Sequence, residues 1–142
     1  MPTVRRRALV LDDNPTLRKV LWKLFEGRGY EVFTFPDPGL CPLHIARACP
    51  CPQFAVCADI IVSDLNMVDG NGIDFLEQLV QKGCKQMHLA LMSGNFTETD
   101  LVRASRLRCK LFTKPLAMAQ LTAWVEEVER LIPSERTLFD WH

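Results

Sequence analysis

Apolar and polar positions follow two patterns along this chain. Short apolar runs rich in Val, Ile, Leu and Phe are separated by stretches in which apolar residues recur with helical period. Such runs are typical of buried strands, and recurrence every three or four residues is typical of amphipathic helices. The runs predict strands at residues 8–11, 30–35, 59–64, 87–92 and 109–113, and the periodic stretches predict helices at residues 15–27, 40–48, 73–83, 97–107 and 118–131.

Capping signals support several helix boundaries. Asn14 is a good N-cap and Pro15 fits the first helical position. The run Thr-Glu-Thr-Asp at residues 97–100 has the spacing of a capping box, and Pro133 ends the last helical stretch.

Strands that alternate with helices predict an α/β fold. Short connections and right-handed crossovers favour a doubly wound, five-stranded parallel sheet of flavodoxin-like type, with strand order 2-1-3-4-5 and helices on both faces. Residues 1–133 are predicted to form one domain, and residues 134–142 are predicted to form a C-terminal tail too short for an output domain. This tail carries three apolar residues, Leu138, Phe139 and Trp141. Two interpretations are equally open: the tail packs on the domain or on a partner, or it is a flexible end.

Composition narrows the class of protein. With 142 residues, of which 48% are hydrophobic and 24% charged, the chain suits one soluble globular domain. Lys+Arg and Asp+Glu number 17 each, so no overall positive field recruits nucleic acid or anionic lipid. No stretch reaches the ~20 apolar residues of a membrane helix, and no signal peptide is evident, so a cytoplasmic location is expected. The basic run at residues 5–7 is expected to be a solvated charge run.

Polar residues gather where the predicted strands end. Asp12 and Asp13 follow the first strand, Asp64 ends the third, Ser93 follows the fourth, and Lys114 follows the fifth. In open parallel sheets these ends meet at one edge, where ligands bind. Crowded carboxylates repel one another, and a hard cation such as Mg²⁺ relieves that repulsion while leaving positions open for a phosphate. The pattern therefore predicts a site in which a carboxylate meets a phosphoryl group.

With these residues in view, the chain resembles the receiver domain of two-component response regulators over almost its full length. The matching pieces, in order, are Asp12-Asp13, Asp64 within Ser63-Asp64-Leu65-Asn66-Met67, Gly70 to Gly72, Ser93-Gly94, and Lys114-Pro115. Each piece is weak alone, but five in order at predicted strand ends are a specific signal.

The resemblance implies a role for each matching residue. Asp64 would be the phosphoacceptor, and it would hold Mg²⁺ together with Asp13 and the backbone carbonyl of Asn66, with Asp12 acting through metal-bound water. Lys114 would pair with the phosphoryl group.

The hydroxyl of Ser93 would also move toward that group. The implied partners are a sensor histidine kinase or phosphotransfer protein and an unidentified target that binds the last two helices and the fifth strand. The resemblance implies a stand-alone switch, with phosphotransfer and autodephosphorylation as its only chemistry.

Two positions depart from the family pattern. Leu111 stands where the family usually has an aromatic switch residue, and Phe112 is expected to point to the opposite face of the sheet. Val68 replaces a usual loop proline. The phosphorylation chemistry depends on neither position.

Cysteines supply an alternative function. Cys41, Cys49, Cys51 and Cys57 fall within one short, proline-rich stretch, and the six cysteines of a chain without an export signal suggest a reducing compartment. Three interpretations stay open: reduced thiols, a separate Zn²⁺ site, or one or two disulfides. The rivals to a switch are thus a metal- or redox-sensing module using this cluster, and a Mg²⁺-dependent phosphohydrolase with Asp64 as nucleophile.

Overall fold

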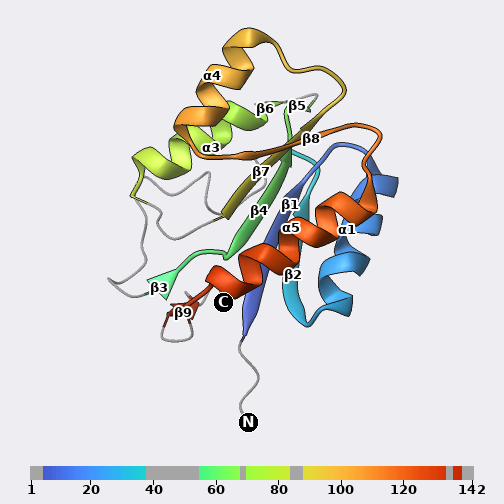
Figure 1. The fold of residues 1–142 in the computed structure, drawn as a ribbon, viewed down its shortest axis with the longest axis vertical. Coiled ribbons are helices and arrows are strands. Elements are labelled where there is room, and N and C mark those ends of the chain that lie inside the picture. The colour runs from blue at the N-terminus through green and yellow to red at the C-terminus, as the bar shows by residue number, and fades with distance from the viewer. Residues whose placement is uncertain (1–4, 38–54, 68–69, 84–87, 134–135, 139–142) are drawn as a thin grey trace.

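The computed structural model describes residues 5–37, 55–67, 70–83, 88–133 and 136–138 (Figure 1). Its central feature is a five-stranded sheet in which every neighbouring pair of strands is parallel. The strands are β1 (Arg6–Leu11), β2 (Tyr30–Phe35), β4 (Ile60–Asp64), β7 (His88–Ser93) and β8 (Lys110–Thr113). Their order across the sheet is β2-β1-β4-β7-β8, which confirms the predicted order 2-1-3-4-5.

Helices cover both faces of this sheet, as predicted. The helices α1 (Pro15–Gly27) and α5 (Met118–Leu131) lie on one face, and α3 (Gly72–Gln81) and α4 (Glu98–Arg106) lie on the other (Figure 1). Alternate residues of each strand enter alternate cores, because successive side chains of a strand point to opposite faces. In β1, for example, Val10 packs with α1 and α5, whereas Leu9 and Leu11 pack with α3. The helix predicted at residues 40–48 lies outside the described residues.

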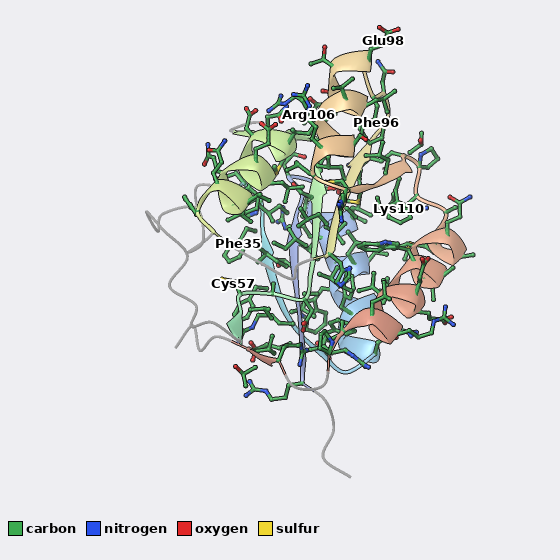
Figure 2. The ribbon with its side chains drawn as sticks, turned by 60° about the vertical axis from the view of Figure 1, so that its left-hand side comes forward. Phe35, Cys57, Phe96, Glu98, Arg106 and Lys110 are labelled. Carbon is green, nitrogen blue, oxygen red and sulfur yellow. The ribbon has the colours of Figure 1, made fainter. Side chains whose placement is uncertain are left out.

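Side chains fill both layers between the sheet and its helices (Figure 2). The predicted caps are confirmed: Asn14 accepts hydrogen bonds from the first turn of α1, and Thr97 and Asp100 form the capping box of α4. Within the described residues, no helix is long and apolar enough to cross a membrane.

Two small ladders accompany the main sheet and were not predicted. β3 (Ala55–Val56) pairs with β9 (Thr137–Leu138), and β5 (Asn66–Met67) pairs with β6 (Gly70–Asn71). Ladders of two residues are too short to leave a periodic trace in a sequence. The described part of the C-terminal tail therefore packs back on the domain.

A buried ion pair anchors that tail. Arg136 donates from Nε to Asp59 Oδ1 at 2.7 Å and from Nη2 to Asp59 Oδ2 at 2.6 Å. Asp59 immediately precedes β4, so the tail is tied to the amino end of the central strand. The basic run at residues 5–7 also differs from expectation, because Arg7 is 2% exposed and donates to Glu31 and to the carbonyl of Cys57.

The turn between β4 and α3 brings two backbone segments into close approach at Gly72. A Cβ added to Gly72 would lie 2.2 Å from the carbonyl oxygen of Asp64, and the amide of Gly72 donates to the carbonyl of Leu65. A larger side chain would therefore push α3 away from the end of β4.

We expect Gly72→Ala to lower the free energy of unfolding by about 1–3 kcal/mol, because the added methyl group overpacks this contact. Gly27→Ala is the matched control: nothing lies within 4 Å of its Cβ position, and the substitution should stabilise the protein by roughly 0.4–1 kcal/mol. Urea unfolding of the two variants checks both values. Equal stability of the two variants would contradict the close approach.

Candidate functional site at the carboxyl ends of the strands

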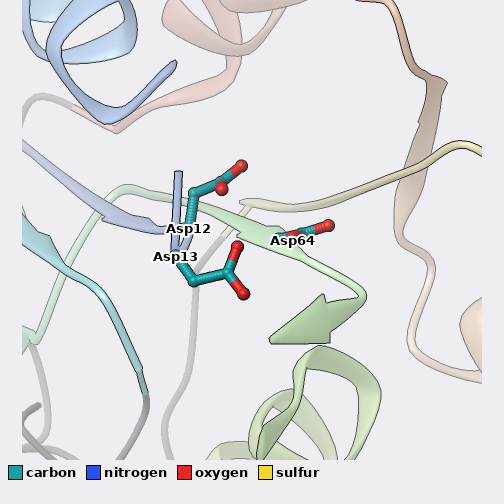
Figure 3. Close-up of side chains that lie close together, drawn as sticks. All are labelled: Asp12, Asp13 and Asp64. Carbon is teal, nitrogen blue, oxygen red and sulfur yellow. The ribbon is translucent and has the colours of Figure 1, made fainter. Parts of the chain in front are cut away.

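Three carboxylates meet at the carboxyl edge of the sheet, as the sequence predicted. Asp12 and Asp13 follow β1, and Asp64 is the last residue of β4 (Figure 3). One oxygen from each lies within 4.8 Å of the others. Asp12 and Asp64 are buried, whereas Asp13 is more exposed. The cluster is thus partly withdrawn from water and open on the Asp13 side.

The ammonium group of Lys114 lies between two of these carboxylates. Its Nζ is 3.0 Å from Asp12 Oδ2 and 3.3 Å from Asp64 Oδ1. Lys114 comes directly after β8, the edge strand, and its amide donates to the carbonyl of Ser93 at 2.8 Å. This backbone bond aligns the ends of β7 and β8, so the lysine side chain can reach across the sheet edge.

The crowding of charge shifts the protonation equilibria of the site. Burial raises the pKa of Asp64, and the negative charges of Asp12 and Asp13 raise it further, while Lys114 opposes them. For Lys114, burial lowers the pKa, but its hydrogen bond to Asp12 and the charges of Asp12 and Asp64 outweigh that effect and raise it. The acidic cluster therefore favours the charged form of Lys114, whereas Lys114 offsets the rise in the pKa of Asp64 only in part.

The donor set fits a hard divalent cation. Mg²⁺ prefers carboxylate, carbonyl and water oxygens, and three carboxylates beside one ammonium leave an excess of negative charge. Burial is the main cause of the raised pKa of Asp64, and the negative charges of Asp12 and Asp13 add to it. Asn66 follows in β5 with an exposed side chain, and the metal role of its carbonyl stays a prediction.

Ser93 lies at the predicted strand end, but its hydroxyl is engaged locally. The Oγ atom donates to the carbonyl of Asn95 at 2.8 Å and accepts from the amide of Asn95 at 3.1 Å. The structure thus brings Ser93 next to Lys114 through the backbone, with the hydroxyl turned into its own loop.

Two neighbours of Asp12 were missed by the sequence reasoning. The amide of Asn14 donates to Asp12 Oδ1 at 2.7 Å, and Arg18 Nη1 donates to the backbone carbonyl of Asp12 at 2.7 Å. The helical period places Arg18 on the first turn after the Asn14 cap. No motif, however, marks a contact from an arginine to a main-chain carbonyl.

Comparison with known proteins decides the family. The family model described as "Response regulator receiver domain" matches residues 8–126. The chain belongs to this family. Its members are phosphorylation-controlled signalling switches rather than conventional enzymes.

A curated relative gives further context for this receiver domain. A probable transcriptional regulatory protein of Picosynechococcus sp. is 27% identical over 125 residues, which cover 85% of this chain and 48% of the relative. The chain thus spans about half the length of the curated relative that it matches.

Solved structures with the same fold include other receiver domains. The non-phosphorylated HemR receiver domain of Leptospira biflexa has a TM-score of 0.74 and 23% identity, covering 90% of this chain and 97% of that chain. The chemotaxis protein CheY4 of Vibrio cholerae has a TM-score of 0.68 and 21% identity, covering 87% of this chain and 98% of that chain. At these identities the likeness concerns the fold.

The receiver domain separates Leu111 and Phe112 as the alternation of strand side chains predicted. Leu111 packs partly buried against the core that holds α3 and α4. Phe112 is buried on the opposite face, where its ring meets that of Trp124 edge-on at 5.8 Å between centroids. The aromatic residue of β8 is therefore part of the α5 core.

Among the cysteines of the predicted cluster, Cys57 lies buried in the hydrophobic core. Cys41, Cys49 and Cys51 lie outside the described residues, as does Val68. Neither the family match nor the described residues support the Zn²⁺ hypothesis. Cys109, which directly precedes β8, lies outside the predicted cluster. Burial raises the pKa of its thiol to about 12, so the thiol stays protonated near neutral pH.

The electrostatics of the site predict a pH-dependent stability. Because the pKa of Asp64 is raised in the folded state, ionising this carboxyl favours the unfolded chain, whose Asp titrates near about 3.9. The contribution of protonated Asp64 to the free energy of unfolding is complete below the unfolded-state pKa, and it is lost as the pH rises through the folded-state pKa. We therefore expect Asp64→Asn to raise the free energy of unfolding at pH 7, with a smaller gain at pH 3.

Urea unfolding in metal-free buffer across this pH range measures the difference. Asp74→Asn is the control, because Asp74 is exposed on α3 and pairs with Arg103, so its loss should bring no gain at pH 7. A wild-type protein at least as stable as Asp64→Asn at pH 7 would argue against a raised pKa of Asp64.

Proposed function

We propose that Asp64 accepts a phosphoryl group from a sensor histidine kinase or phosphotransfer protein in a Mg²⁺-dependent reaction. One observation carries the proposal: the Asp64 carboxylate lies within 3.3 Å of the Lys114 ammonium and shares the sheet edge with Asp12 and Asp13. This arrangement supplies a nucleophile, a cation for the transferred oxygens and ligands for a divalent cation.

The reaction requires little covalent chemistry from the protein. A carboxylate oxygen of Asp64 bonds to phosphorus as the phosphorus–nitrogen bond of a phosphohistidine breaks, and the departing imidazole takes a proton from water. Alignment and charge neutralisation then govern the rate. Burial of Asp64 removes competing solvent, and its raised pKa makes the ionised carboxylate a stronger nucleophile. Lys114, already 3.3 Å from this carboxylate, pairs with the transferred oxygens.

Asp12, Asp13 and Asp64, with the carbonyl of Asn66, would hold the Mg²⁺ ion. When bound, the ion would neutralise the negative charge that builds up on the phosphoryl oxygens. Asp12 is buried and already bonded to Lys114, which agrees with an action through metal-bound water rather than direct coordination.

A phosphoryl group on Asp64 would change the loops after β7 and β8. Its oxygens are strong acceptors that compete for Lys114 with Asp12 and draw the Ser93 hydroxyl away from Asn95. Since the amide of Lys114 is bonded to Ser93, the two loops would move together. The affected surface includes α4, where Leu101 and Val102 are exposed.

That surface, formed by β8, α4 and α5, would bind a downstream protein target. We propose a cytoplasmic protein whose direct partners are proteins rather than nucleic acid or membrane. The equal numbers of basic and acidic residues support this choice. Family membership also favours a switch over the phosphohydrolase and the cysteine-based sensor.

Incubation with acetyl phosphate and Mg²⁺ tests the proposal, with an intact mass spectrum as readout. We expect one added phosphoryl group on the wild type and none on Asp64→Asn. Asp74→Asn, which alters an exposed aspartate on α3, should be phosphorylated like the wild type. Omission of Mg²⁺ should suppress the addition. A wild type that stays unmodified, or an Asp64→Asn variant that gains the group, would refute Asp64 as the phosphoacceptor.

A further inference from the structure

Asp12 is held from four directions. Its amide donates to the carbonyl of Phe35, its Oδ1 accepts from the amide of Asn14, and its Oδ2 accepts from Lys114. The fourth contact comes from Arg18, whose Nη1 donates to the backbone carbonyl of Asp12 at 2.7 Å. Two of these contacts hold the carboxylate of Asp12, one holds its amide, and Arg18 holds its main-chain oxygen.

The carbonyl that Arg18 binds also belongs to the peptide unit leading into Asp13. A peptide unit is planar, so the direction of the Asp12 carbonyl fixes the direction of the Asp13 amide and the place of the Asp13 Cα. A bond from a guanidinium is charge-assisted and about twice as strong as a neutral one. Arg18 therefore restrains the more exposed carboxylate of the cluster through the backbone.

Arg18 is itself firmly placed. It lies in the first turn of α1, and its amide donates to the carbonyl of Asn14 at 3.0 Å. Side chains of a helix point toward its amino terminus, which directs Arg18 back over the turn between β1 and α1. The helix and the acidic residues before it are thereby joined by a side-chain strut.

We propose that Arg18 is a positioning residue for the acidic site, which holds the peptide between Asp12 and Asp13 so that Asp13 stays beside Asp12 and Asp64. This inference rests on the proposed function, because it concerns the residues that would hold Mg²⁺. It adds a side chain that acts through the backbone carbonyl of Asp12.

Two physical effects of Arg18 have opposite signs. As a positive charge bonded to the backbone of Asp12, Arg18 repels a divalent cation, so its removal would tighten Mg²⁺ binding. As a strut it preorganises the ligands, so its removal would weaken Mg²⁺ binding. We infer that the strut dominates, because the guanidinium is bonded directly to the turn that carries the ligand.

Isothermal titration with Mg²⁺ decides between them. We expect Arg18→Met to weaken Mg²⁺ binding by about tenfold, which is typical when a residue that supports metal ligands is removed. Arg18→Lys keeps a charged donor on a shorter side chain, and its affinity for Mg²⁺ should lie between those of the wild type and Arg18→Met. Lys19→Met removes the same charge from the neighbouring, exposed position of α1 and should bind Mg²⁺ like the wild type.

Urea unfolding of each variant checks that the fold is intact, and Arg18→Gln replaces Arg18→Met if the latter does not fold. Unchanged or tighter Mg²⁺ binding by the folded variant would overturn the proposal, as would an equal loss in Lys19→Met. Phosphorylation by acetyl phosphate separates this proposal from the function itself. If the wild type gains a phosphoryl group while Arg18→Met binds Mg²⁺ normally, the positioning role of Arg18 is wrong and the proposed function is supported. If the wild type stays unmodified while Arg18→Met binds Mg²⁺ more weakly, the positioning role is supported and the proposed function is wrong.

Discussion

Repulsion among three carboxylates at one edge of a parallel sheet governs this receiver domain. Asp12, Asp13 and Asp64 are brought within 4.8 Å because β1 and β4 are adjacent and end together. Lys114, which follows the edge strand β8, relieves part of that repulsion, but burial and the remaining negative charge keep the pKa of Asp64 raised. The site is therefore folded in a state that favours added positive charge, and a cation or a rearrangement of Lys114 changes its energy directly.

The aspartates at the two ends of β4 differ in their environments. Asp59 is buried before the strand, and both of its carboxylate oxygens accept hydrogen bonds from Arg136. Its side chain joins the described tail to the domain and has a full set of partners. Asp64, at the opposite end of the same strand, shares a single ammonium with Asp12 and faces other carboxylates. Asp59, bonded through both oxygens, ties the tail to the domain, whereas the crowded Asp64 is the residue for which we propose a reaction.

Rigidity around the acidic cluster comes from local backbone contacts. The close approach of Gly72 to the carbonyl of Asp64 places α3 against the end of β4, and Arg18 bonds α1 to the carbonyl of Asp12. By contrast, the hydroxyl of Ser93 is held within its own loop. The side of the site that would hold the metal is thus braced by two helices, and the side that would respond to phosphate lies on the loops after β7 and β8.

The sequence by itself determined the sheet, its strand order and the edge at which Asp12, Asp64, Ser93 and Lys114 meet. Apolar periodicity marks each buried strand, and parallel strands end at the same edge, so one-dimensional positions translate into a shared location. Only the tertiary structure decided the contacts of Arg18 with the carbonyl of Asp12 and of Arg136 with Asp59. The first is made to a main-chain atom, which no residue type encodes. The second joins side chains 77 residues apart, next to a two-residue ladder that is too short to leave a periodic signal.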